Sequence, residues 1–354
     1  MRVLFVSNGH GEMAIAARVA AEVRGMAAAQ TDHLALVGVA RPDSCFGPVG
    51  PQRALPSGGL VAMGNVAALA RDVASGFLSL WLGQRRFLLA ASREYHVVVG
   101  VGDAYCLWMA LAAKRPTVFV GTAKSVHVAP YGPFERATLR RAARVFVRDR
   151  ATADELQTHG VAAHAPGNVI ADLAQSTQPY AWTAPERIVV LPGSRADAYD
   201  NAARIGRVLA GLPDGEREVV VSVAAGIDAA RILAKLAVPA RPWEGDLGGI
   251  FAGATLAFGQ AGTANEAAAA AGLPVVALAD PLQREDWYRM RQRRLLDGAL
   301  ALISPDAQAG AAQLRALLGD AVRLAEMSRI GRERMGSPGA ARAIAAATVE
   351  VSAE

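Results

Sequence analysis

The stretch TLAFGQAGTANEAAAAAGLPVVAL, residues 255–278, holds a complete strand–helix–strand unit. Its apolar ends, 255–258 and 274–278, predict two buried strands, and the Ala-rich segment 264–271 predicts the helix between them. Gly272 closes this helix, as glycine commonly does at a helix end. Strands joined through a helix run parallel, because the crossover returns the chain to the starting end of the sheet. The stretch therefore predicts an α/β fold.

The same alternation of apolar runs and helical stretches extends along the chain. In the first half the expected strands are 2–6, 34–39, 97–101, 117–120 and 145–147, and the expected helices are 12–28, 64–93, 104–114 and 133–143. The second series has expected strands at 187–191, 218–223, 255–258 and 274–278, and expected helices at 200–211, 228–236, 264–271 and 284–296. Apolar strands followed by helices indicate parallel sheets that are covered on both faces.

Two such series predict two doubly wound, Rossmann-like domains. The Pro- and Thr-containing stretch 174–185 separates the two series. We therefore expect an N-terminal domain over 1–170 and a C-terminal domain over 171–337. The Ala-rich segment 338–354 predicts a last helix, which we expect to pack back on the first domain. A chain of 354 residues, 52% of them hydrophobic, is large enough for two cores.

Four motifs directly follow expected strands. They are SNGHGE (7–12), GDAY (102–105), PGSR (192–195) and GQAGTANE (259–266), two in each expected domain. In open parallel sheets, ligands bind beyond the carboxyl ends of the strands. We therefore expect these four loops to carry the binding residues and to face each other across an interdomain cleft.

The PGSR motif is typical of a phosphate-binding turn. Gly193 and Ser194 expose backbone N–H groups, and the guanidinium of Arg195 matches phosphate oxygens in a bidentate way. The alternative is an ordinary strand-to-helix turn that ends in a surface arginine.

The GQAGTANE motif predicts a further contact to an anionic ligand. Gln260 and Gly262 precede a helix that Thr263 and Ala264 begin, and the free N–H groups and dipole of such a helix start attract phosphate. Glu266, in the first turn, can accept hydrogen bonds from ribose hydroxyls. The alternative is structural, because Thr263 and Glu266 also have the spacing of a capping box.

These motifs together resemble the lipid-A-disaccharide synthase family of GT-B glycosyltransferases. The nucleotide-sugar half is matched by LPGSR (191–195) and AGTANEAAAAAGLPVV (261–276). The first half is matched by SNGHGE, VGDAYCLWMA (101–110), FVGTAKS (119–125), FVRDRATADELQTHGV (146–161) and GNVIAD (167–172). Two features depart from the synthases, which have an AGE-type opening loop without a histidine and place the motif's Glu one residue later than Glu266. The resemblance therefore indicates a relative with its own substrate.

The resemblance implies an inverting glycosyltransferase with a UDP-sugar donor, UDP-N-acetylglucosamine or a derivative of it. It also implies a lipid or lipid-linked acceptor in the N-terminal domain. GT-B enzymes generally work without a metal, and the sequence has no short Asp-x-Asp pair, so we expect neither metal nor cofactor. Arg195 and the helix start at 262–266 would then offset the charge of the departing diphosphate.

In GT-B enzymes the loop after the first strand faces the anomeric carbon of the donor. Gly9 and Gly11 would let the backbone approach the ligands closely. Histidine titrates near neutral pH, so His10 is a candidate base for the acceptor hydroxyl. Glu12 is the next candidate, although an acidic residue also suits a first helical turn. A turn that only begins the helix is the structural alternative.

Asp103 resembles the family's aspartate that deprotonates the acceptor or orients a catalytic group. An N-cap is the alternative, since aspartate suits that position well. The strands before His10 and Asp103 are expected to be neighbours. The two side chains would then form a pair in which one is the base and the other orients it. Lys124 and Ser125 of the GTAKS segment are candidate contacts to acceptor or phosphate, and a plain surface charge is the alternative for Lys124.

The net charge of +5 favours an anionic partner. Arginines cluster at 84–86, 140–150 and 289–294. None of these clusters is interleaved with aromatic residues as a base-stacking surface would be, so nucleic acid is not expected. The segment GFLSLWLGQRRFLLAASREY (76–95) is either a core helix or a contact to an anionic membrane surface. Cys45 and Cys106 are the only cysteines, and no signal peptide or membrane-spanning run is evident. We therefore expect a cytoplasmic protein that is peripheral to the inner face of the cytoplasmic membrane.

Two rival functions remain open. A nucleotide-sugar 2-epimerase has the same two-domain fold and would release free sugar without any acceptor. A non-catalytic protein that senses UDP-sugars or acts as a membrane-associated scaffold would bind UDP and convert nothing.

Overall fold

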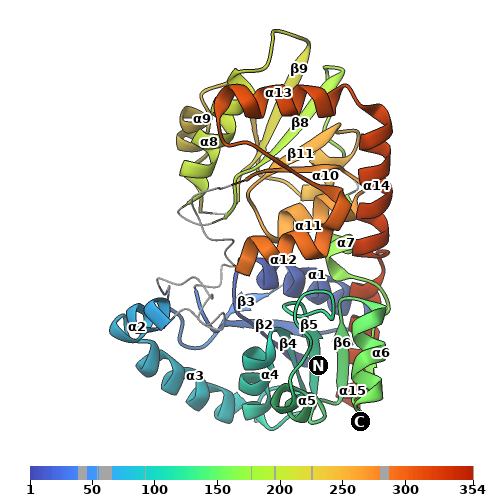
Figure 1. Cartoon of the computed structure of the whole chain (residues 1–354). Coiled ribbons are helices and arrows are strands. Elements are labelled where there is room, and N and C mark those ends of the chain that lie inside the picture. The colour runs from blue at the N-terminus through green and yellow to red at the C-terminus, as the bar shows by residue number, and fades with distance from the viewer. Residues whose placement is uncertain are drawn as a thin grey trace. The chain divides into compact units, whose positions relative to one another are not determined.

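The computed structural model describes residues 1–38, 46–53, 55, 66–91, 93–176, 178–194, 197–224, 226–279 and 287–353, without the side chains of His10, 66–69 and 287–289. The chain divides into two compact units (Figure 1). The first unit comprises Met1–Asp172 and Pro338–Glu354, and the second comprises Leu173–Ser337.

The described part of the first unit contains one seven-stranded sheet in the order β3-β2-β1-β4-β5-β6-β7, with every pairing parallel. Its strands are β1 (Arg2–Ser7), β2 (Gln30–Ala35), β3 (Gly47–Pro48), β4 (Val97–Gly102), β5 (Thr117–Gly121), β6 (Arg144–Val147) and β7 (Ala163–His164). The order reverses at β1 and β4, which are therefore neighbours in the centre of the sheet. Such a reversal is where open α/β sheets bind ligands.

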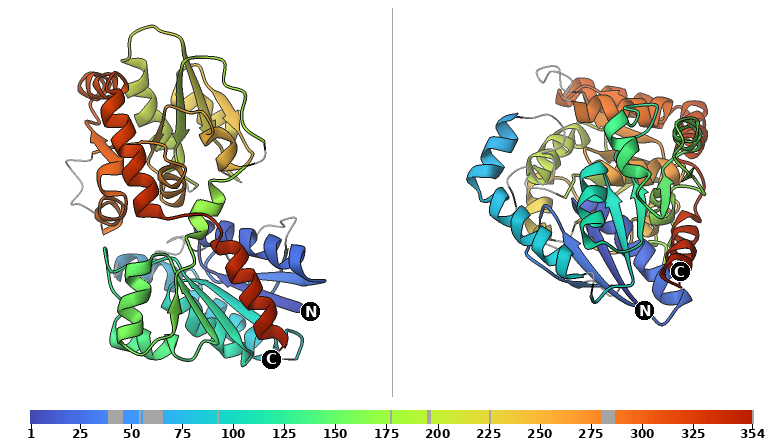
Figure 2. Two further views of the ribbon diagram at one scale, coloured as in Figure 1. Left: turned by 90° about the vertical axis from the view of Figure 1, so that its right-hand side faces the viewer. Right: turned by 90° about the horizontal axis from the view of Figure 1, so that it is seen from below.

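The described part of the first unit also contains helices, several of which pack on the sheet. They are α1 (His10–Met26), α2 (Val66–Ala74), α3 (Phe77–Ala91), α4 (Ala104–Ala110), α5 (Pro133–Leu139), α6 (Arg150–Thr158), α7 (Val169–Leu173) and α15 (Ala340–Ala353). The apolar side chains of α3 and α4 pack with those of β1, β2 and β4 in one core. The C-terminal helix α15, dark red in Figure 2, packs against α1 and also contacts β4 and β5.

Two local predictions for the first unit were wrong. The second strand covers Gln30–Ala35 instead of 34–39, because its polar residues are paired inside the fold. Asp32 accepts hydrogen bonds from Arg2 and Tyr95, and His33 bonds to Ser7. The single helix expected over 64–93 is two helices, since Gly76 adopts φ +91° between them. Residues 64 and 65 lie outside the described residues.

The described part of the second unit contains a six-stranded parallel sheet in the order β10-β9-β8-β11-β12-β13. Its strands are β8 (Glu186–Leu191), β9 (Arg217–Ser222), β10 (Arg241–Trp243), β11 (Leu256–Gly259), β12 (Val275–Leu278) and β13 (Leu300–Ile303). Its helices are α8 (Ala198–Ala210), α9 (Ala229–Leu236), α10 (Leu247–Phe251), α11 (Thr263–Ala270), α12 (Trp287–Leu296), α13 (Ala307–Leu318) and α14 (Ala321–Met335). The start of the helix expected at 284–296 lies outside the described residues.

The prediction of two Rossmann-like α/β units with parallel sheets is confirmed. In the second unit β8, β11 and β12 are buried along most of their length, and α8 and α13 pack in the same core. β8 and β11 pair directly, so the segments that follow them begin side by side. Both units therefore bring two of the four motifs together at a carboxyl edge of their own sheet.

Candidate functional site

In the first unit, the motifs after β1 and β4 are joined by a hydrogen bond between side chains. Nδ2 of Asn8 donates to Oδ1 of Asp103 over 3.0 Å. The backbone N–H of Cys106 donates to the same oxygen over 2.9 Å, so Asp103 is the N-cap of α4. The capping alternative is thus confirmed, and it leaves Asp103 at the carboxyl edge where a ligand would bind.

The environment of Asp103 favours its protonated form. Burial raises the pKa of its carboxyl above the ordinary value, while the hydrogen bonds from Cys106 and Asn8 oppose that rise. A carboxylate whose pKa is raised in this way is a better proton acceptor when it is ionised, which is what a general base requires.

Glu12 lies at the same edge. Its Oε2 accepts a hydrogen bond of 3.2 Å from the backbone N–H of Gly9, the residue that caps α1. Gly102, with φ +144°, lies against Glu12 and Asn8. A Cβ on Gly102 would be 3.5 Å from Cγ of Glu12 and 3.7 Å from Nδ2 of Asn8. Glycine is needed at this junction because an L side chain rarely adopts such a φ. Glu12 is thus bound to its own helix start and lies against Gly102, the residue before Asp103.

The structure places His10 and Gly11 in the first turn of α1. The expectation that the helix begins near residue 12 was wrong by two residues, since Gly9 caps it. The side chain of His10 lies outside the described residues, and its proposed role stays a prediction.

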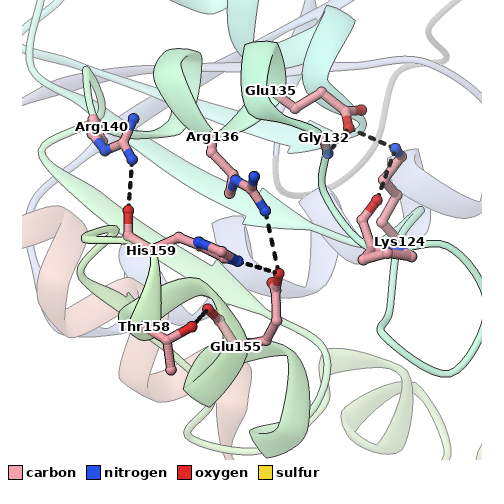
Figure 3. Close-up of polar contacts among 9 residues, drawn as sticks. Lys124, Gly132, Glu135, Arg136, Arg140, Glu155, Thr158 and His159 are labelled. Atoms are coloured by element: carbon pink, nitrogen blue, oxygen red, sulfur yellow. Dashed lines mark hydrogen bonds and ion pairs between the residues drawn. The ribbon is translucent and has the colours of Figure 1, made fainter.

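Lys124 is held by an acidic partner (Figure 3). Its Nζ lies 2.6 Å from Oε2 of Glu135 and donates to the carbonyl of Pro130 over 3.4 Å. The same carboxylate oxygen accepts from the N–H of Gly132 over 2.7 Å. The ion pair therefore ties the segment after β5 to the start of α5, so Lys124 is more than a plain surface charge.

The same view shows a second carboxylate, Glu155 of α6, between Arg136 on α5 and His159, the residue that follows α6. It lies 3.4 Å from Nη1 of Arg136 and 3.2 Å from Nε2 of His159 (Figure 3). Ser125 is buried, and its Oγ accepts from the N–H of His127. These contacts stabilise the segments around the carboxyl ends of β5 and β6.

The phenol hydroxyl of Tyr131 lies next to Gly121, the last residue of β5. Its side chain is 1% exposed, and its hydroxyl has no hydrogen-bond partner within the described residues. A Cβ on Gly121 would lie 2.4 Å from that hydroxyl, so the two residues are matched in shape. Burial raises the pKa of the Tyr131 phenol well above its ordinary value.

In the second unit, the residue after β11 meets the last residue of β8. The backbone N–H of Gln260 donates to the carbonyl of Leu191 over 2.9 Å. Gly193, with φ +113°, gives the turn after β8 a conformation that favours glycine. Ser194 follows it and is partly buried. Arg195 lies outside the described residues, and its contact to phosphate stays a prediction.

The start of α11 does not have the capping box that was the structural alternative for Thr263 and Glu266. Gly262 is the N-cap, so Thr263 and Ala264 are the first two residues of the helix and the Thr263 capping box does not form. Glu266 is 2% exposed, and its Oε1 lies 3.3 Å from Nη1 of Arg291 on α12. A ribose hydroxyl would therefore have to share this carboxylate with Arg291.

Sequence reasoning missed two residues at these edges. Asn8 is visible in the SNGHGE motif as a polar residue directly after a buried strand, and that position was a usable signal. Arg291 lies 25 residues from its partner Glu266. No local pattern marks such a pair.

Two further observations concern the described residues only. They contain no group of three or more His, Cys, Asp or Glu residues that could hold a metal ion. Among the helices that the structure describes, none is both long enough and apolar enough to cross a membrane.

Comparison with known proteins supports the fold. No protein-family model matches the chain, and no curated protein sequence does. Solved structures do match over nearly the whole chain. MurG from Acinetobacter baumannii has a TM-score of 0.60 at 17% identity, covering 99% of both chains. The glycosyltransferase SnogD from Streptomyces nogalater has a TM-score of 0.58 at 19% identity, also covering 99% of both.

A third similar structure belongs to another class of enzyme. It is a putative UDP-N-acetylglucosamine 2-epimerase from Listeria monocytogenes, with a TM-score of 0.61 and 14% identity over 98% of this chain and 95% of that one. Identities this low show a shared fold alone. The chain therefore has the GT-B fold, which these glycosyltransferases share with the epimerase.

Proposed function

We propose that this chain is an inverting glycosyltransferase that moves a hexose or N-acetylhexosamine from a UDP-sugar to a hydroxyl of a lipid or lipid-linked acceptor. The observation that carries the proposal is the pair Asn8–Asp103, which presents a carboxylate at the reversal point of the first sheet. The motif resemblance to lipid-A-disaccharide synthases supports the same assignment. The structural similarity to MurG and SnogD is consistent with it.

In the proposed reaction, Asp103 or His10 takes the proton of the acceptor hydroxyl. The acceptor oxygen then bonds to the anomeric carbon, and the bond from that carbon to the diphosphate oxygen breaks. UDP leaves with the electron pair, and the sugar configuration inverts because attack and departure occur on opposite faces. Arg195 and the N-terminus of α11 would stabilise the charge on the leaving diphosphate.

Donor binding is tested first by thermal unfolding with nucleotides. UDP and UDP-N-acetylglucosamine should stabilise the protein, by about 2.7 kcal/mol at about 100 Kd, whereas NAD and ATP should not. Arg195→Ala should weaken UDP binding more than uridine binding, because the guanidinium is proposed to meet phosphate. An unchanged melting temperature with every uridine nucleotide would contradict the donor assignment and also the sensor alternative.

A 2-epimerase remains the second candidate, because similar solved structures include such enzymes. The products separate the two reactions. Incubation with UDP-N-acetylglucosamine and lipid extract should yield UDP and a glycosylated lipid if the chain is a transferase. An epimerase instead changes the configuration at C2 of the sugar and needs no lipid, which NMR of the sugar product detects.

Membrane contact is proposed for the outer face of α3. Leu78, Leu82 and Leu89 are 56%, 47% and 43% exposed and share one face of the helix with the exposed Arg86. Apolar side chains beside arginine suit the interface of an anionic bilayer. Binding to vesicles that contain phosphatidylglycerol, with Leu78→Ser/Leu82→Ser as the weakened variant, tests this contact. Equal binding of the variant would contradict it.

A further inference from the structure

Asn8 has contacts that a simple turn residue does not need. It follows β1 directly, and its side chain is only 8% exposed. Nδ2 donates to Oδ1 of Asp103, whereas Oδ1 of Asn8 has no hydrogen-bond partner within the described residues. Buried polar atoms in native proteins are nearly always paired with protein, water or ligand. The free oxygen therefore indicates a place for a hydrogen-bond donor from outside the chain.

The orientation of this amide is determined by its neighbour. Turning the amide over would bring its oxygen against Oδ1 of Asp103, and two acceptors repel each other. With Nδ2 toward Asp103, that carboxylate oxygen receives two donors, from Asn8 and from the N–H of Cys106. Two converging donors restrict rotation of the carboxylate about its own bond.

The titratable groups around Asp103 come from several elements. Burial raises the pKa of Tyr105 and Cys106 on α4 and that of Tyr131 before α5, so all three are neutral near pH 7. Glu12 on α1 is an acidic residue that lies against Gly102, next to Asp103 in the chain, and accepts from Gly9. Among the described side chains, Asn8 is therefore a main polar group that favours the ionised form of Asp103.

We propose that Asn8 is the positioning residue of Asp103 and that its free Oδ1 accepts a hydrogen bond from a second O–H of the acceptor, beside the hydroxyl that Asp103 deprotonates. This inference rests on the proposed function. The proton of the hydroxyl moves to the carboxylate, the hydroxyl oxygen bonds to the anomeric carbon, and UDP leaves with the electrons of the bond that breaks. Asn8 itself undergoes no covalent change.

The first test needs no substrate. The pKa of Asp103 is measured by carbon-13 NMR of labelled aspartate, with Asp103→Asn to assign the signal. Asn8→Leu, which keeps the size but removes the donor, should raise that pKa by on the order of 1 unit. Asn8→Asp adds a negative charge and should raise it further, and this variant keeps the shape of the side chain if the leucine variant does not fold.

The matched control is Gln84→Leu. Gln84 is another buried amide of the first unit, and its Nε2 donates to backbone carbonyls of Ala35, Leu36 and Pro51, away from Asp103. This variant should lose stability and leave the Asp103 titration unchanged. An Asp103 pKa that is the same in wild type, Asn8→Leu and Asn8→Asp overturns the proposal, as does an equal shift in Gln84→Leu.

The second test uses water as the simplest hydroxyl acceptor and UDP-N-acetylglucosamine as donor, with release of UDP as the readout. Asn8→Leu should lower kcat on the order of 10²-fold with little change in KM for the donor. The acid limb of its pH profile should move to higher pH, because a raised pKa keeps Asp103 protonated longer. An unshifted limb at wild-type kcat overturns the role of Asn8. If the wild type releases UDP neither with water nor with the lipid extract, the proposed function fails, while the NMR result still decides whether Asn8 positions Asp103.

Discussion

Glu266 and Arg291 form a buried ion pair in the second unit, with 3.3 Å between Oε1 and Nη1 and side chains that are 2% and 11% exposed. Removing one partner leaves the other charge in the interior without this ion pair. Arg291→Met should therefore lower the free energy of unfolding by about 3–5 kcal/mol. The double variant Glu266→Gln/Arg291→Met should lose clearly less than the two single losses combined.

Urea unfolding of the wild type, Glu266→Gln, Arg291→Met and the double variant measures this coupling. The control is Arg329→Met, since Arg329 pairs with Glu326 and Glu333 on the exposed face of α14 and should matter little. Additive losses in the double variant would show that the pair is not coupled.

Asp103 has a structural and a proposed chemical role, and two substitutions separate them. Asparagine caps helices as well as aspartate, so Asp103→Asn should keep the stability of α4, whereas Asp103→Ala should cost about 1 kcal/mol. If Asp103 is the base, both variants should lose turnover by roughly 10²–10⁴-fold. Unfolding curves and UDP release measure the two effects.

Asp149 provides the control, because it caps α6 in the same way through the N–H of Thr152. Asp149→Asn should keep full turnover. If Asp103→Asn stays active and His10→Ala does not, His10 is the base and Asp103 only a cap.

Gly121 and Tyr131 are predicted to be coupled through packing. A Cβ at Gly121 would overlap the Tyr131 hydroxyl, so Gly121→Ala should destabilise the first unit by about 1–3 kcal/mol. Tyr131→Phe removes a hydroxyl without a partner among the described residues, so it should cost little. In the Tyr131→Phe background, Gly121→Ala should lower the stability of the first unit by less than it does in the wild type. Thermal unfolding checks this, and an equal loss in both backgrounds would contradict the predicted overlap.

Glu218 should make the stability of the second unit depend on pH. Burial opposes its ionisation, but hydrogen bonds from Thr183 and Tyr180 and the charge of Arg241 outweigh burial and lower its pKa to about 2. A carboxyl whose pKa is lowered by folding stabilises the native state above the unfolded pKa, near 4.5. This contribution is lost as pH falls from about 4.5 to about 2.

Urea unfolding between pH 2 and pH 7 tests the prediction for Glu218. Glu218→Gln should be less stable than wild type near neutral pH, and the gap should close as the medium becomes acidic. The exposed Glu216, two residues earlier, gives the control Glu216→Gln. Parallel pH curves for wild type and Glu218→Gln would contradict the linkage.

Part of the candidate site was predictable because its signals are local. Asp103 follows a run of buried residues and precedes an apolar helix, and both its cap and its place at the sheet edge follow from those few positions. Gly193 was predictable in the same way, as the turn after a strand. The position of Asn8 directly after a strand was a usable signal, but the roles of Asn8 and Tyr131 could not be predicted, since what a buried amide or hydroxyl does depends on the residue opposite it.

The sequence by itself determined that this protein is built from two parallel α/β units, because hydrophobic periodicity and helix caps are encoded within a few neighbouring residues. It also determined the four strand-end motifs. Only the tertiary structure decided that Asn8 holds Asp103, 95 residues away, and that Arg291 pairs with Glu266. Strand order and helix packing determine which residues become such partners. Both depend on burial of apolar surface along the whole chain and are therefore not encoded in any short stretch. The polar residues of β2 show the same cause, since Asp32 and His33 can lie in a strand only because Arg2, Tyr95 and Ser7 meet them there.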